Sequence, residues 1–546
     1  MKGRSISSLG LLFISVSAIL GSGWLFGSFY AAQAAGPASI LSWIIGGVFV
    51  IIIAFTFAEL CASVPVSGSS VRIPSFTHGT VVGIFCSLNT WFCYVTLTVI
   101  ETMAVMQYLS FYFTSIMHPK GGLTFIGYTV ATILIFCMSV INTYSVKYIV
   151  RFNTFLTLIK IVIPIFVSIL LVDAYFHIHS AANPHVVASS VFAPFGWHGI
   201  FAAISVGGIV FSYNAFKQAA EMAGEAKNPN FSVPFAIVGS VILCMIVFLF
   251  LQVGFLSALQ PNDLKNGWAN LTLMNNQSPF VSLLAEHGIN WAIPVLYFAA
   301  IISPMAAALI YCTGAARSLY GIAANGYAPQ VLLKLNKSGE SALTVWINFV
   351  LAIIIFHFFK NWDQISNLLT CLFAISYGLA PVCMVALRVQ LPSLKRPFKL
   401  PIGYIWAYIA FFITTLFIYW VGWDTISGVV WFFVFCLIVT IIFQKTSKKP
   451  ASEIKTEWKA SIWLWAYLVV IVIASKLGDY GHGAGIMTGF CTVIFLAVCS
   501  AAVFYIAAKY TLPPERIQSE IDKALSTKDE GGHYTKKIRR NPGIRT

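Results

Sequence analysis

Long apolar runs separated by short polar stretches fill this chain from about residue 9 to residue 508. A helix that crosses the hydrocarbon core of a bilayer takes about 20 mainly apolar residues. We expect such helices near 9–35, 37–64, 81–113, 123–141, 150–172, 199–216, 234–256, 291–323, 343–359, 365–387, 404–421 and 426–443. Two further runs, 462–475 and 485–508, form either two more spans or a re-entrant or surface pair, because the first of them is short. The pattern predicts an all-α polytopic membrane protein with 12–14 spans.

The first apolar run is interrupted by Gly21, Ser22 and Gly23, with a half-span of apolar residues on either side. The interruption therefore falls near the bilayer midplane. Unwound backbone at that depth is tolerated where it lines a cavity or is buried in protein, and a broken helix there indicates a transporter binding site. The alternative is that these small residues only let two helices pack closely.

The sixth apolar run has a similar interruption, five spans after the first. It contains Gly207 and Gly208, continues through Ser212 and Asn214, and becomes polar at Lys217. Corresponding breaks in two halves of a membrane protein are typical of an inverted repeat around a midplane site. The second break therefore favours the binding-site interpretation over close packing.

Composition and charge agree with a membrane protein. Hydrophobic residues make up 58% of the chain and charged residues 9%, and the formal net charge is +15. The basic residues gather in alternate loops, which predicts a cytoplasmic N-terminus by the positive-inside rule and gives no reason to expect a nucleic-acid partner. The loops predicted inside hold Arg72, Lys147, Arg151, Arg317, Lys334, Lys337, Arg388, Lys395, Arg396, Lys399, Lys445, Lys448, Lys449, Lys455 and Lys459, whereas those outside hold Lys120, Lys265, Lys360 and Lys476.

Several patterns do not lead to further sites. Lys2, Arg4 and the following apolar run imitate a signal peptide, but the run is longer than a usual signal segment, so we expect a retained first span. The 11 cysteines form no CxxC pair, which gives no indication of a disulfide framework or a metal site. Histidines at 177, 179, 185 and 198 lack ligands at metal spacing, so we expect no metal and no cofactor.

The chemistry expected at two helix breaks suits an α-amino acid. Backbone N–H groups at the start of a half-helix favour a carboxylate, while free carbonyls beside the breaks accept from an ammonium group. The candidate substrate-binding residues are Ile19, Gly21, Ser22, Gly23, Trp24, Phe211, Ser212, Tyr213 and Asn214.

Lys160 lies in the middle of the fifth apolar run, and ionisable residues within spans are expensive and usually functional. It could carry a proton, stand permanently in place of a coupling cation, or only donate to carbonyls at a helix end. We place Glu101, Lys217 and Glu221 nearer the ends of their spans, with a possible Lys217–Glu221 pair one turn apart.

Three stretches resemble the amino acid–polyamine–organocation (APC) superfamily of amino acid permeases. They are the break at Gly21–Gly23, the run 221–229 (EMAGEAKNP) followed by Pro234, and the run 316–337 that begins ARSLY and contains NGYAP. Glu59 with Pro65 and Gly68 is also similar to the family's second-span ending. The run 216–229 is most similar to that of bacterial members that are aspartate–proton symporters.

The resemblance implies a leucine-transporter-like five-plus-five inverted repeat, with spans 1 and 6 discontinuous, alternating access around a midplane site, and about four additional C-terminal spans. It also implies a gating role for Phe211, a substrate contact for Tyr311, and a role for Lys160 that favours H⁺ over Na⁺ coupling. Some exchangers of the family carry an acidic residue where Lys217 stands. A lysine there would suit an acidic substrate.

We therefore expect a cytoplasmic N-tail (1–8), a transporter core (9–390, with repeats at about 9–173 and 199–390), additional transmembrane helices (391–510) and a polar cytoplasmic tail (511–546), in a cell membrane. The tail permits a short helix and is predicted to be disordered or regulatory. The expected function is secondary active transport of an amino acid, coupled to H⁺. An amino acid exchanger and, more remotely, a membrane-embedded transferase are the alternatives; the oligomeric state is left open.

Overall fold

The computed structural model describes residues 6–66, 68–118, 121–144, 147–178, 191–336, 340–447 and 449–526, without the side chains of 147–156, 177–178 and 526. Parts of the predicted N-tail (1–5) and polar tail (527–546) lie outside this range, as do His179, His185, Lys337 and the side chain of His177. Within it the chain is helical and contains no strand, only two isolated bridges.

The helices follow one another along most of the described chain, joined by turns, loops and 3₁₀ segments. They are α1 (Ser8–Ile19), α2 (Gly23–Ala35), α3 (Ser39–Ser63), α4 (Ser69–Leu109), α5 (Phe125–Tyr144), α6 (Lys147–Ile178), α8 (Gly196–Ser205), α9 (Ile209–Ser212), α10 (Gln218–Glu221), α11 (Pro229–Ala258), α12 (Pro279–Glu286), α13 (Ile293–Ala324), α14 (Ala342–Phe358), α15 (Trp362–Gln390), α16 (Gly403–Val421), α17 (Trp423–Thr446), α18 (Ala451–Leu477), α19 (Gly489–Lys509) and α20 (Pro514–Ser526).

The described residues include eleven helices long and apolar enough to cross a membrane, or up to twelve when the bent pair 196–221 counts as one span. In that count 23–63 is a single run that contains both α2 and α3, while α1 and α14 are shorter apolar helices. The all-α polytopic architecture is thereby confirmed, and both predicted breaks are present, between α1 and α2 and along 206–217.

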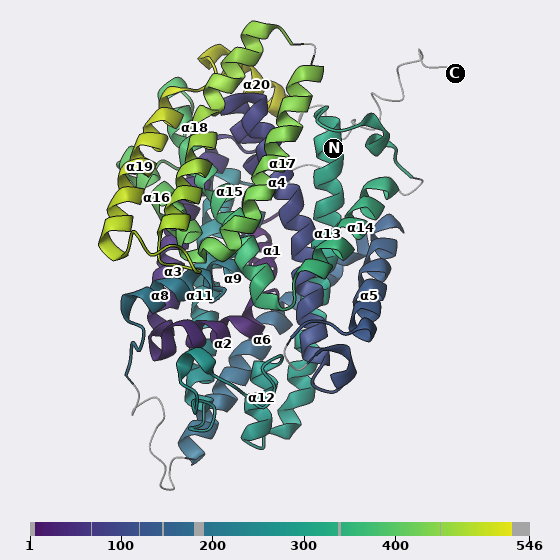
Figure 1. Ribbon diagram of the computed structural model, residues 1–546. Coiled ribbons are helices and arrows are strands. Elements are labelled where there is room, and N and C mark those ends of the chain that lie inside the picture. The colour runs from purple at the N-terminus through teal and green to yellow at the C-terminus, as the bar shows by residue number, and fades with distance from the viewer. Residues whose placement is uncertain are drawn as a thin grey trace.

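The broken helices lie in the centre of the bundle (Figure 1). There α1 packs on α11, α2 packs on α8 and α9, and α3 packs on α11. This pairing of the first spans of one half with the first spans of the other is the arrangement expected of the predicted five-plus-five repeat. Figure 1 also shows α16, α18 and α19 at one side of the bundle and α5 and α14 at the opposite side.

Two regions differ from the sequence-based boundaries. The third span was expected from about 81, but α4 begins at Ser69, and Gly79, at φ 84°, joins a short first segment to the long membrane segment. The thirteenth run was expected to be short, but α18 extends over 27 residues, because its first turns are charged and still helical. The polar tail forms α20 after residue 513, and its Ile517 and Ile521 are buried against the bundle.

We call the end of the bundle that carries Arg72, Arg317 and Arg388 the basic end; α20 lies there, and α12 lies at the opposite end (Figure 1). Near the basic end the guanidinium of Arg388 in α15 donates two hydrogen bonds, of 2.7 and 2.6 Å, to the buried carboxylate of Glu59 in α3. The backbone N–H of Leu400 donates to the same carboxylate at 2.7 Å. This buried pair ties α3 to α15 and to the segment before α16.

Candidate functional site

The first break leaves the backbone of residues 20–22 outside any helix. α1 ends at Ile19, Leu20 takes φ −81° and ψ 61°, and α2 begins at Gly23 without a hydrogen bond from the Ser22 side chain to its first turn. The N–H of Gly21 donates to the Ile19 carbonyl at 2.9 Å. The N-terminus of α2 therefore lies inside the bundle, and such a terminus favours an anionic group.

The carbonyl groups at the end of α1 accept hydrogen bonds from side chains of two neighbouring helices. The bonds, each of 3.1 Å, run from Lys160 Nζ of α6 to the Ser17 carbonyl, from Tyr311 Oη of α13 to the Ala18 carbonyl, and from Ser303 Oγ of α13 to the Leu20 carbonyl. Helix ends buried in a membrane need such partners, since no water is present to satisfy their carbonyls. Lys160 therefore contacts the last turn of α1, next to the break. This contact agrees both with a structural role and with a role in coupling.

Glu101 of α4 faces the same break, although the sequence analysis placed it nearer the end of a span. A Cβ added to Gly21 would lie 2.6 Å from Glu101 Oε1, so the carboxyl group packs directly on the glycine. The same carboxyl group lies beside the backbone N–H and the hydroxyl of Ser22, and its Oε2 has no hydrogen-bond partner among the described residues. Glu101 and Lys160 interact electrostatically across the break. An acidic residue inside an apolar run was the signal that could have identified it.

The second break touches the first. Gly208 takes φ 76°, a left-handed conformation that glycine adopts without strain, and it separates α8 from the single turn α9. The chain then bends by 43° before continuing through 214–221. A Cβ added to Gly23 would lie 2.5 Å from Ser212 Oγ, so the two broken spans meet at that glycine.

Trp362, at the start of α15, closes the side of the two breaks that faces away from the basic end. Its Nε1 donates to Ser22 Oγ at 2.9 Å, and the residue is fully buried. Its ring stacks on Phe26 and on Tyr30, with centroids 5.2 and 5.9 Å apart, and meets Phe211 edge to face at 5.2 Å. Sequence reasoning missed Trp362, because nothing in its local pattern links it to a break 340 positions earlier.

On the other side a cavity of about 690 Å³, which we call the vestibule, extends from Tyr94 and Gln218 toward the basic end. It is bounded by α1, α4, α6, α10 and the second half of α13, and it reaches the exposed residues Glu225, Arg317 and Asn325. The path is therefore open toward the basic end and closed by aromatic rings toward the opposite end.

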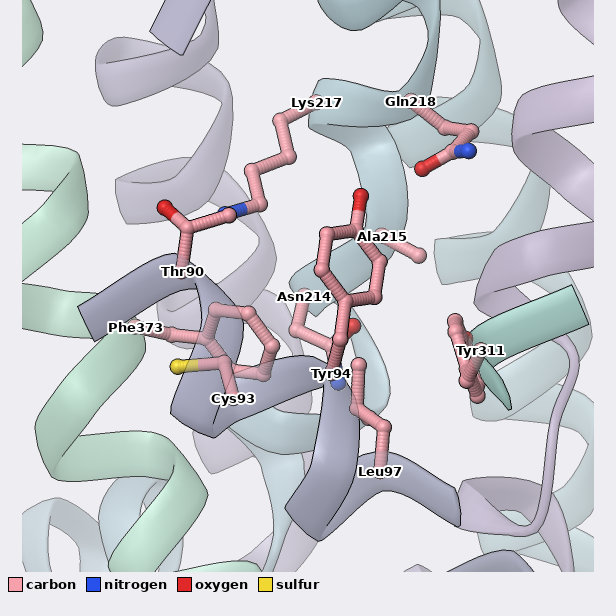
Figure 2. A pocket seen from close by; sticks show the side chains of 10 residues that line it. All are labelled: Thr90, Cys93, Tyr94, Leu97, Asn214, Ala215, Lys217, Gln218, Tyr311 and Phe373. Carbon is pink, nitrogen blue, oxygen red and sulfur yellow. The ribbon is translucent and has the colours of Figure 1, made fainter. Parts of the chain in front are cut away.

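A second cavity, of about 10 Å³, adjoins the vestibule close to the second break. Figure 2 shows the ten side chains that line it, which are Thr90, Cys93, Tyr94, Leu97, Asn214, Ala215, Lys217, Gln218, Tyr311 and Phe373. Thr90, Tyr94 and Gln218 line both cavities. We call this second space the side pocket.

The predicted substrate-binding residues do not all face these spaces. Asn214 and Tyr311 line the side pocket. Trp24 instead packs toward Phe280 of α12, with ring centroids 6.4 Å apart, and Tyr213 donates to the Trp43 carbonyl at 3.4 Å. Both lie away from the two cavities described above.

Gly23 and Ser212 form the contact between the two breaks, and Ser22 and Phe211 both contact Trp362. Ile19 and Gly21 are joined by a backbone hydrogen bond within the first break.

Lys217 lies deeper than its sequence position indicated. Its side chain is 5% exposed, and its Nζ lies 5.0 Å from the centre of the Phe373 ring. Among the described residues Lys217 and Glu221 form no salt bridge, although they interact electrostatically, and the Glu221 carboxylate accepts a hydrogen bond from Ser70 Oγ. The backbone N–H of Gly68 donates to the Glu221 carbonyl at 3.0 Å, so α10 is tied to the start of α4.

Residues 6–443 match the family model described as amino acid permease. The chain belongs to the amino acid permease family. The match includes both breaks, the vestibule and the side pocket. The expected resemblance to the APC superfamily is thus confirmed, and the family is one of transporters rather than enzymes.

Two relatives resemble this permease over nearly its whole length. The aspartate-proton symporter of Bacillus subtilis (strain 168) is 32% identical over 514 residues, which are 94% of this chain and 97% of that protein. The glutamate/serine transporter AimA of the same organism is 31% identical over 513 residues, or 92% and 93% of the two chains. The aromatic amino acid transport protein AroP of Escherichia coli (strain K12) is 25% identical over 390 residues, 66% of this permease and 80% of AroP.

Proposed function

We propose that this permease carries an α-amino acid across a cell membrane by alternating access, together with a proton. The observation that carries the proposal is the first break, where unwound backbone meets a buried acid and a buried amine, in a span whose first half, α1, lines a vestibule that opens toward the basic end. Midplane breaks of this kind bind substrates in transporters. The basic loops support an N-terminus on the cytoplasmic side, with the vestibule open to the cytoplasm.

In this proposal the substrate carboxylate binds the backbone N–H groups of Gly21–Gly23 at the start of α2, and the Gly21 N–H exchanges its bond to the Ile19 carbonyl for the substrate. A helix N-terminus attracts an anion, and the two glycines leave the backbone accessible. The substrate ammonium group binds carbonyls beside the breaks, around Ile19 and Phe211. Phe211 lies against Trp362 at the closed side, which supports a gating role. Trp24 and Tyr213 would not touch the substrate but would support the site by packing on Phe280 and by the hydrogen bond to the Trp43 carbonyl.

Lys160 and Glu101 supply the proton step. Both are buried beside the broken span. Lys160 donates to the Ser17 carbonyl near the end of α1, and Glu101 lies beside the Ser22 N–H that a substrate carboxylate would also contact. A proton that neutralises one of them changes the charge at the break, so its arrival and departure are linked to substrate occupancy. Such a buried pair supports symport over simple exchange, which needs no proton site.

The expected substrates follow from the relatives, whose names give aspartate, glutamate and serine. We infer that this permease takes small and acidic amino acids. Exchange of two amino acids is the second mode that the same breaks could perform, and the test separates it from symport.

The test is uptake of labelled amino acids into proteoliposomes that contain the purified permease. We expect accumulation of aspartate, glutamate or serine against a gradient when the outside is more acidic, and loss of that accumulation when a protonophore collapses the pH difference. Exchange that needs no pH gradient would favour the antiporter. If no amino acid is either accumulated or exchanged, the proposal fails.

A further inference from the structure

Lys217 is a buried cation without a salt bridge among the described residues. Its side chain is 95% buried by area, and within those residues it makes no hydrogen bond either. The nearest acid along its own segment, Glu221, interacts with it electrostatically but accepts its hydrogen bond from Ser70. A buried charge is normally paired, because its removal from water is otherwise uncompensated. Contact with the Phe373 ring offsets only part of that loss.

The ammonium group is aimed into the side pocket. Figure 2 shows the Lys217 side chain extending toward Thr90 and the face of Phe373, with Asn214 and Tyr94 on the adjacent walls. The Thr90 hydroxyl also has no hydrogen-bond partner among the residues that the structure describes. The pocket measures about 10 Å³ and shares Thr90, Tyr94 and Gln218 with the vestibule, from which a carboxylate would enter it. A buried cation without a salt bridge thus lines a small space in which an anionic group would be stabilised.

The position of the pocket links it to the substrate. Asn214 and Ala215 of its wall directly follow α9, and Tyr311 of its wall donates to the Ala18 carbonyl in the first break. A ligand whose backbone groups lie at the breaks would therefore direct its side chain toward Lys217.

We propose that the side pocket binds the side-chain carboxylate of an acidic amino acid, with Lys217 as its counter-ion, Thr90 as a hydrogen-bond donor and Phe373 as the surface that positions the ammonium group. The proposal rests on the proposed function, which it deepens by naming the residues that select the substrate. Lysine presents a single mobile charge rather than a rigid fork, so it accommodates both aspartate and glutamate. A chloride ion is the other source of negative charge that could fill this pocket.

The experiment compares aspartate with serine in proteoliposomes that contain wild type or Lys217→Gln. We expect kcat/KM for aspartate to fall by about 10- to 100-fold, the range for loss of a charged hydrogen bond, while kcat/KM for serine changes by less than about threefold. Retained serine transport shows that the variant is folded. Lys334→Gln, which removes an exposed cation at the basic end, is the matched control and should leave both values unchanged.

Two further variants report on the mechanism. Thr90→Val keeps the shape of the side chain and removes its hydroxyl. This variant should lower kcat/KM for aspartate by about threefold to tenfold. Lys217→Arg keeps the charge and should retain more of the preference for aspartate than Lys217→Gln does. Each series is repeated with gluconate in place of chloride; a preference for aspartate that depends on chloride would assign the pocket to that ion and overturn the proposal.

The outcome separates this inference from the proposed function. An unchanged ratio of aspartate to serine in Lys217→Gln overturns the inference and leaves amino acid transport intact. If the wild type transports no amino acid, ligand-induced thermal stabilisation of the detergent-solubilised permease decides the matter without transport. Aspartate should then raise the Tm of wild type but not of Lys217→Gln, and an equal shift in both, or no shift in either, contradicts the inference.

Discussion

At the scale of single residues, the first break depends on one glycine and the acid that faces it. Gly21 does not have the left-handed backbone conformation that favours glycine. A glycine is required there because Glu101 packs against it, and not because of its φ. The sequence predicted the break from Gly21–Gly23, but it did not predict Glu101 as the facing group. That relation depends on how α4 packs against α1, which no local pattern records.

We expect Gly21→Ala to lower transport at least tenfold, because its methyl group would lie 2.6 Å from Glu101 Oε1. Overpacking of this kind typically costs about 1–3 kcal/mol. Glu101→Asp shortens the acid, so the double variant should recover part of the lost activity in proteoliposome uptake. If the double variant is no better than Gly21→Ala, the restriction does not come from this contact.

Lys160→Ala should abolish accumulation driven by a pH gradient while exchange across symmetric membranes continues. The variant removes the amine that contacts the Ser17 carbonyl and interacts with Glu101, so substrate occupancy is no longer linked to a proton. Uptake at a series of external pH values measures this. An unchanged pH dependence in the variant would leave Lys160 with the structural role alone.

At the scale of elements, hydrogen bonds join the kink at Gly79 in α4 to the tail helix α20 and the segment before it. The backbone N–H of Leu512 donates to the Thr77 carbonyl at 2.9 Å, just before Gly79. The fully buried Glu457 carboxylate accepts hydrogen bonds from Thr80, Gln444, Lys449 and Arg516, at 2.9, 3.1, 2.7 and 2.8 Å. The sequence permitted a helix in the tail but could not predict this docking, because the buried acid and its partners come from five separate helices or loops.

Arg516→Ala should loosen α20 from the bundle. The variant removes one charged hydrogen bond from Glu457 and one from Glu453, both 2.8 Å, and because Arg516 is partly exposed we expect a loss of about 1 kcal/mol. Chymotrypsin should cut after Tyr510 faster than in wild type. Lys523→Ala is the control, since its ion pair with Glu520 is exposed; equal cleavage in both variants would contradict the role of Arg516.

At the scale of the whole molecule, the structure is open toward the basic end and closed at the other by Trp362 with Phe26, Tyr30 and Phe211. The spans and the two breaks could be predicted from apolar runs and glycines. Which end of the bundle is open and which is closed could not be predicted, because this depends on which aromatic side chains meet across the bundle.

Trp362→Ala should shift the permease toward the state that is open at the opposite end. The variant removes the indole that donates to Ser22 and stacks on two aromatic rings. Hydrogen exchange of amides in 20–30 should become faster, measured by mass spectrometry on the purified protein. Trp431→Ala, at a tryptophan that is 76% exposed, is the control; unchanged exchange in 20–30 would show that Trp362 does not hold this side closed.

The vestibule also makes transport depend on the activity of water. At about 30 Å³ of liquid volume per molecule, a cavity of about 690 Å³ holds on the order of twenty waters, which leave when its mouth closes. A polymer too large to enter should slow the step that reopens the mouth, and the slope of the logarithm of the rate against osmotic pressure should report on the order of twenty waters. Glycerol, which enters the cavity, should give no such slope. In each transport cycle the same number of water molecules would then leave and re-enter the vestibule, in addition to the substrate.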